Sequence, residues 1–116
     1  MPYVDGFVIP VPKANREAYV KLAERVAAVF KEYGALKVVE CWGEDVPQGK
    51  ITSFPMAVKS KEDETVVFSW IIWPSRAGRD EGSRKVMADP RMQPAETMPF
   101  DGKRLIYGGF EIVFES

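Results

Sequence analysis

Among the side chains that could move a proton, three are singled out by their positions on predicted strands: the carboxyl groups of Asp5 and Glu40 and the phenol of Tyr107. Burial raises the pKa of a carboxyl group towards neutrality, and such a group can then accept and return a proton during a reaction. For Glu40 a plain surface position on an outer strand is the alternative. These three residues are the candidate catalytic residues.

Histidine is absent from the 116 residues, and cysteine occurs once, at Cys41. The chain therefore lacks the usual haem ligand, the usual zinc ligand and the usual general base at neutral pH, and a serine–histidine–aspartate triad is excluded. Because Cys41 has no histidine to activate its thiol, we expect it to pack as a small side chain. We expect neither a metal nor another cofactor.

Aromatic residues are the second group that could take part in ligand binding or catalysis, and two interpretations are open for them. They could form the walls of a flat pocket for an aromatic or quinone-like ligand, or they could belong to the core or to an interface between copies of the chain. The residues concerned are Trp42, Trp70, Trp73, Phe100 and Tyr107.

Small residues mark one stripe of a helix predicted over 76–88, for which Ser75 is the expected N-cap. Gly78, Gly82 and Val86 share this stripe. Each interior glycine costs about 1 kcal/mol of helix stability relative to alanine. The stripe could border a ligand cavity between helix and sheet, allow close packing of the helix on the sheet, or face solvent.

Arginines on the same helix have three open interpretations. Arg76 and Arg79 could belong to a solvated face of ion pairs, or they could hold a carboxylate ligand at the start of the helix. Alternatively, Asp5 pairs with Arg76, in which case Asp5→Asn destabilises the fold. The candidate ligand-binding residues are Trp70, Trp73, Arg76, Gly78, Arg79 and Phe100.

Hydrophobic periodicity predicts the elements that position these residues. Apolar residues recur every three or four positions over 15–33, which predicts a helix with Asn15 as its N-cap and Gly34 at its end. Residues 43–65 read as an excursion from the sheet, and Gly108-Gly109 suggests a bulge or a close approach of another group to the backbone. The predicted strands cover residues 3–11, 36–42, 66–73 and 104–114.

The resulting order of elements is β-α-β-β-α-β. It predicts an α+β fold of the ferredoxin-like type, in which a four-stranded antiparallel sheet carries two helices on one face. At this length the chain is expected to form a single domain, residues 1–116.

The strand over 66–73 is apolar on both sides, with Phe68, Trp70 and Ile72 on one side and Ile71 and Trp73 on the other. Two helices can cover only one face of the sheet, so the other face would remain apolar and bare. Four strands are too few for a membrane barrel, and a cofactor would cover only part of the face. A second copy covers all of it, and we expect a homodimer joined sheet to sheet.

Composition limits the other partners. Sixteen basic and seventeen acidic residues give a net charge of −1, which disfavours nucleic acid. No apolar run approaches the roughly 20 residues of a membrane-spanning helix, so we expect no membrane partner and a cytoplasmic protein.

Motifs along nearly the whole chain are similar to those of the YbaA-like family of uncharacterised bacterial proteins. They are YVDGFVIPVPKAN (3–15), EYGAL (32–36), TSFPMAVKSKEDETVVFSWI (52–71), SRAGRD (75–80), KVMADPR (85–91) and MPFDGKRLIYGGFE (98–111). The resemblance implies a dimeric α/β-barrel, in which two ferredoxin-like protomers pack sheet against sheet. It also implies that relatives carry a larger residue, often histidine, at the position of Gly78, so a role for that side chain is lost here.

Three functions are compatible with these observations. The protein could bind a small metabolite between helices and sheet, without chemistry. It could be a cofactor-independent monooxygenase or isomerase that acts on an aromatic or quinone-like substrate. It could also be a protein-interaction module that uses the 43–65 excursion and the 90–103 loop.

Overall fold

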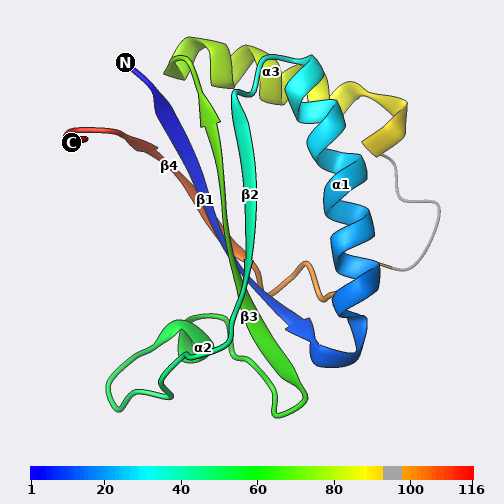
Figure 1. The fold of residues 1–116 in the computed structure, drawn as a ribbon, viewed down its shortest axis with the longest axis vertical. Helices are drawn as coiled ribbons and strands as arrows, with labels where there is room; N and C mark the ends of the chain where they lie inside the picture. Colours follow the sequence, from blue (N-terminus) through cyan, green and yellow to red (C-terminus); the bar gives the residue numbers. More distant parts are fainter. Residues whose placement is uncertain (93–97) are drawn as a thin grey trace.

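A computed structural model describes residues 1–92 and 98–116, and its centre is one four-stranded antiparallel sheet (Figure 1). The strands lie in the order β2-β3-β1-β4, and helices α1 and α3 lie together on one side of them. This confirms the predicted ferredoxin-like fold. The elements are β1 (Tyr3–Pro12), α1 (Arg16–Glu32), β2 (Lys37–Trp42), α2 (Phe54–Ala57), β3 (Glu64–Trp73), α3 (Arg76–Ala88) and β4 (Ile106–Glu111), with 3₁₀ turns at Lys13–Asn15 and Pro90–Met92.

The two central strands, β1 and β3, pair over their full lengths, from Tyr3 opposite Trp73 to Pro12 opposite Glu64. Their residues are rich in valine, isoleucine and aromatics, which suit a sheet that is covered on its faces. Because side chains alternate between the faces, this register decides which residues lie beneath the helices.

The core lies between the helices and the sheet, in two clusters of buried side chains. One surrounds Trp73 at the α3 end of the sheet, and the other surrounds Tyr19 of α1. Phe30 packs edge-on against Trp73, with ring centroids 6.0 Å apart, while Phe100 packs in the same manner on Tyr19 at 5.7 Å. The amphipathic stripe of α1 therefore supplies both clusters, as its periodicity predicted.

Helix ends follow the sequence signals in all but one case. The Ser75 hydroxyl accepts a hydrogen bond from the Gly78 N–H at 3.0 Å and caps α3, and Gly34 follows α1 in the left-handed region with φ +110°. Asn15 occupies the N-cap position of α1 as predicted, but its side chain does not cap the helix. A 3₁₀ turn runs directly into the helix, and the Asn15 amide donates to the Pro99 carbonyl instead, at 2.9 Å.

Strand β4 is shorter than predicted. Its last paired residue, Glu111, lies opposite Tyr3, where β1 begins, so the chain beyond it has no neighbouring strand to pair with. Gly108 and Gly109 pair one-to-one with Gly6 and Asp5, which rules out a bulge at this place. The close approach is real: a Cβ at Gly109 would collide with the Arg79 guanidinium and the Tyr3 ring.

The excursion, residues 43–63, leaves β2 and returns at β3 on the side of the sheet away from α1 (Figure 1). Ser53 caps its short helix α2 by accepting a hydrogen bond from the Met56 N–H at 3.1 Å. Where the excursion returns to β3, the Arg104 guanidinium donates to both oxygens of the buried Glu64 carboxylate, at 2.8 and 2.7 Å. It also donates to the Lys59 carbonyl. This fork ties the end of the excursion to the segment before β4.

Part of the predicted 90–103 loop, including Pro94, lies outside the described residues. In the remainder, none of the helices is both long and apolar enough to cross a membrane.

Candidate functional site

The face of the sheet opposite the helices, called the open face below, is the first candidate site. The strand register places a continuous set of apolar side chains on it. Among them, Phe68, Ile106 and Phe110 are exposed, while Trp70 and Ile72 are half-buried. The open face consists of Val4, Val8, Val39, Cys41, Phe68, Trp70, Ile72, Ile106 and Phe110, with Gly6 and Gly108 in its floor.

The floor of the open face is built from glycines. Gly6 pairs with Gly108, and the Phe110 ring leans over both, with its Cε1 atom 3.6 and 3.5 Å from where their Cβ atoms would be. The result is a shallow apolar groove of about 600 Å³. Such a groove can receive apolar side chains or an apolar ligand.

The excursion covers one end of the open face. Phe54 of α2 packs edge-on against Phe68, with ring centroids 5.9 Å apart, and Phe68 in turn contacts Trp70 at 5.7 Å. Val66, at this end of β3, is buried. Residues 1–92 and 98–116 leave the rest of the open face uncovered.

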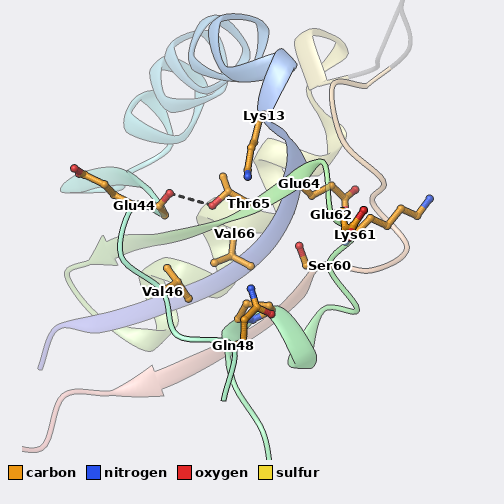
Figure 2. A pocket seen from close by; sticks show the side chains of 12 residues that line it. Lys13, Glu44, Val46, Gln48, Ser60, Lys61, Glu62, Glu64, Thr65 and Val66 are labelled. Carbon is orange, nitrogen blue, oxygen red and sulfur yellow. Dashed lines mark hydrogen bonds between the residues drawn. The ribbon is translucent and has the colours of Figure 1, made fainter. Parts of the chain in front are cut away.

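A polar groove of about 520 Å³ lies beside the excursion and the start of β3 (Figure 2). Figure 2 shows the Lys13 side chain extending from its turn towards Thr65, whose hydroxyl donates to the Gly43 carbonyl at 3.0 Å. Charges of both signs line the groove, and the fork from Arg104 holds the pKa of Glu64 below its usual value. Its lining includes Lys13, Glu44, Gln48, Ser60, Lys61, Glu62 and Thr65.

On the helix side, Glu40 of β2 meets Tyr19 of α1. The Tyr19 hydroxyl donates to Glu40 Oε1 at 2.7 Å. Desolvation raises the pKa of Glu40, and hydrogen bonds from Tyr19 and Ser69 oppose this shift. Burial, with the adjacent carboxylate, also raises the pKa of Tyr19. Glu40 therefore holds a proton more readily than a free glutamate does. This is so even though Glu40 lies on an edge strand and is exposed as a whole residue.

Asp5 is held by two donors beneath α3. Its carboxylate accepts from Trp73 Nε1 at 3.0 Å and from Arg79 Nε at 3.0 Å. The Arg79 guanidinium lies over the Tyr3 ring, 5.0 Å from its centroid, and also contacts Asp80 at 2.7 Å. A carboxylate with this many partners is a structural anchor for α3 rather than a free base.

The three candidate catalytic residues all lie on the helix side, but they are not brought together. Glu40 and Tyr107 stand in one row across the sheet, with Ser69 and Phe7 between them. Three strand spacings of about 4.8 Å separate their positions. Tyr107 is exposed and stacks on Phe7, with ring centroids 6.2 Å apart. Catalysis on an aromatic substrate by these residues stays a prediction.

The candidate ligand-binding residues are also dispersed. Trp70 lies on the open face, whereas Trp73 is buried on the helix side, so these two residues do not share a pocket, contrary to one of the two interpretations open for the aromatic residues. Phe100 belongs to the cluster around Tyr19.

Helix α3 corrects two further expectations. Asp5 pairs with Arg79 and not with Arg76, which lies on the outside and reaches Asp80 at 3.9 Å. A cavity beside Gly82 is also wrong, because a Cβ there would collide with the Trp73 ring and the Tyr33 carbonyl. Gly78 is less crowded than Gly82, but Ser75 Oγ lies 3.2 Å from its Cβ position, a tight contact.

Sequence reasoning missed three features: the role of Tyr19, the Glu64–Arg104 fork and the polar groove. Tyr19 was available as a polar member of an otherwise apolar helix stripe, facing a strand that contains a glutamate. The fork joins residues 40 positions apart in the sequence, and no local sequence pattern predicts such an ion pair. Within residues 1–92 and 98–116, His, Cys, Asp and Glu side chains nowhere gather in threes as a metal site would require.

The chain is similar in sequence and in structure to several known proteins. The uncharacterized protein YbaA of Escherichia coli (strain K12) is 57% identical over 116 residues, covering 99% of each chain, and the protein of the same name in Shigella flexneri matches equally. A crystal structure of a dimeric ferredoxin-like protein from an uncultured marine organism superposes over the whole of both chains with a TM-score of 0.64, at 14% identity. A protein family described as "Protein of unknown function (DUF1428)" matches residues 2–102, and the chain belongs to this family.

Proposed function

We propose that the protein acts as a homodimer in which two open faces pack against each other. The observation that carries this proposal is the continuous apolar open face, which the helices leave uncovered. A two-fold contact presents the same surface twice, so each copy supplies what the other lacks. The fold of the chain is shared with a protein described as dimeric, which supports the same arrangement.

The size of the open face supports self-association on energetic grounds. With three exposed and several half-buried apolar side chains, it presents on the order of 400 Å² of apolar surface, given roughly 200 Å² for a whole aromatic side chain. At about 25 cal/mol per Å², its burial would contribute about 10 kcal/mol per protomer before the costs of association. This burial favours self-association.

Light scattering after size exclusion tests the dimer. Wild-type protein at micromolar concentration is expected at twice the protomer mass of 13.1 kDa. Ile106→Asp, on the open face, is expected to be monomeric, because it places a charge in the buried contact. Val20→Asp on α1 is the matched control, since both wild-type side chains are 45% exposed. A wild-type mass of 13.1 kDa throughout the series would exclude the proposal.

The polar groove supports a second candidate function, the binding of a small metabolite. Its volume falls within the range of ligand pockets, and its lining carries charges of both signs and neutral hydrogen-bonding groups. We infer that it favours a small zwitterion such as an amino acid. The expected site between helices and sheet is not used in this proposal, because Trp73 packs against Gly82 there.

Thermal shift against a panel of amino acids tests the groove. A ligand of the folded state raises the melting temperature by mass action. The shift is expected to disappear in Lys13→Ala and to persist in Lys21→Ala, whose substitution lies on the exposed side of α1. An equal shift in both variants would place the ligand elsewhere.

A further inference from the structure

We propose that, in the dimer, the excursion of each protomer docks against the C-terminal tail, residues 112–116, of its partner. This inference rests on the proposed homodimer and adds its orientation and two further contact segments. The binding partner of both segments is therefore a second copy of this chain.

The excursion carries apolar side chains that its own protomer leaves wholly or partly exposed. Ile51 is 97% exposed, and Phe54 and Met56 of α2 are also exposed. A solvated loop does not ordinarily keep three such residues in six positions, whereas a contact segment does.

The C-terminal tail has the same character. Val113 is 86% exposed and Phe114 is 82% exposed, and the tail follows β4 without joining the sheet. It therefore has apolar side chains to bury and backbone groups to pair, both of which a partner could satisfy.

The excursion and the tail lie at opposite ends of the sheet. The excursion returns at Glu64, opposite Pro12 at the end of β1, whereas the tail leaves from Glu111, opposite Tyr3 at its beginning. At about 3.4 Å per residue, the ten residues of β1 separate these ends by roughly 30 Å. Figure 1 shows the excursion and the C-terminus both on the side away from α1.

Symmetry and space then select the orientation. The two-fold axis of a face-to-face dimer lies in the plane between the sheets. An axis along the strands would bring both excursions to the same end of the dimer, where two neighbouring excursions would have to fit into the gap of about 10 Å that packed sheets leave for side chains. An axis across the strands brings each excursion to the opposite end of its partner, from which the tail leaves. Because the excursion joins β2 to β3 and the tail leaves β4 at the other edge of the sheet, a tilt of this axis within the plane places excursion against tail, and the sheets can close.

The buried area gives independent support. A stable standard interface buries about 800 Å² on each partner, and the open face supplies about half of this. The excursion and the tail together expose on the order of 600 Å² of further apolar surface, using roughly 200 Å² for a whole aromatic side chain. With both segments in the contact, the area reaches the requirement.

Cysteine cross-linking in a Cys41→Ala background tests the orientation. Ile51→Cys and Val113→Cys proteins are prepared separately and treated with a short bismaleimide, alone or after being mixed and allowed to exchange subunits. A covalent dimer is expected from the mixture and not from either variant alone. The matched control replaces Ile51→Cys in the mixture with Lys21→Cys on α1, which should give no covalent dimer.

Each outcome has one meaning when the mass of every variant is measured by light scattering before cross-linking. A covalent dimer from Ile51→Cys alone would show excursion against excursion and overturn the inference. Dimeric masses without a cross-link in the mixture would overturn it while leaving the proposed dimer intact. Monomeric masses for the Cys41→Ala background and for wild type would remove the proposed dimer and this inference together.

Discussion

At the scale of single residues, Asp5 shows how one carboxylate sets the position of a whole helix. It lies on the central strand β1 and is buried, and both of its hydrogen-bond donors belong to the α3 side of the core. Removing its charge takes away the inner counter-ion of the Arg79 guanidinium and leaves only the exposed Asp80 to pair with it. Losing one partner of a buried pair costs more than the pair itself contributes.

Asp5→Asn is therefore expected to lower the free energy of unfolding by about 2 kcal/mol, measured by urea denaturation. Asp80→Asn is the control, because Asp80 contacts the same arginine from an exposed position and should cost less than about 0.5 kcal/mol. Equal stabilities of Asp5→Asn and wild type would mean that Asp5 does not anchor α3.

Glu40 leads to a prediction about pH. Its pKa in the folded protein lies above the ordinary value of 4.5, so the folded state binds the proton more tightly than the unfolded chain. Its contribution to stability is therefore full below pH 4.5 and is lost as the pH rises through the raised folded pKa. Glu40→Gln keeps an acceptor for the Tyr19 hydroxyl and cannot ionise.

The difference in unfolding free energy between Glu40→Gln and wild type is expected to grow in favour of the variant as the pH rises from 4.5 to neutrality. Urea denaturation at several pH values measures it. Comparing the two proteins cancels the opposite contribution of Glu64, whose pKa is lowered in the folded state. A difference that does not change with pH would contradict the raised pKa.

At the scale of elements, the packing of α3 on the sheet opposes its own helix propensity. Gly82 costs the helix about 1 kcal/mol relative to alanine, yet the Trp73 ring and the Tyr33 carbonyl leave no room for a Cβ. The close approach lets α3 cover Trp73 completely.

Gly82→Ala is expected to destabilise the fold by about 1–3 kcal/mol, in spite of the gain in helix propensity. Gly78→Ala, on the same helix, meets Ser75 Oγ at 3.2 Å and Pro74 Cδ at 4.0 Å, so the gain of about 1 kcal/mol in helix propensity is set against a small shift of the capping hydroxyl, and the variant is expected to be clearly more stable than Gly82→Ala. Thermal and urea unfolding of the two variants give the comparison. Stabilisation by both substitutions would show that α3 stands further from the sheet.

The same contrast explains which parts of the structure could be predicted from the sequence. Periodicity depends on neighbours along the chain, so it identified both helices, the faces of β1 and β3 and the ferredoxin-like order. The level at which a helix sits over a strand depends on distant contacts. Arg76 and Arg79 lie one turn apart on α3, and only the packing of Gly82 on Trp73 decides which of them reaches Asp5.

The candidate site was less predictable for a related reason. The apolar alternation of β3 placed Trp70 and Trp73 on opposite sides of the strand and showed that an open face exists, but it could not show which of the two sides the helices cover. The polar groove arises where the excursion folds back beside β3, and the Glu64–Arg104 fork fixes this return. Neither feature has a local sequence signal.

At the scale of the whole molecule, the helix side and the open face of the sheet differ in whether a single chain can bury their apolar residues. The two core clusters are complete within one chain, whereas the apolar residues of the open face are buried only if a second chain is present. If the proposed dimer forms, unfolding converts one dimer into two unfolded chains, and the equilibrium then depends on protein concentration.

The melting temperature of wild type is therefore expected to rise with protein concentration, measured by differential scanning calorimetry over a hundredfold dilution series. Ile106→Asp should melt at a lower temperature that does not change with dilution, because its helix-side core remains and its open face no longer pairs. Val20→Asp should keep the wild-type dependence, since α1 presents that residue away from the proposed contact. A wild-type melting temperature that is independent of concentration would mean that the chain tolerates its open face in water, and the stability of the fold would then have to come from the helix-side core alone.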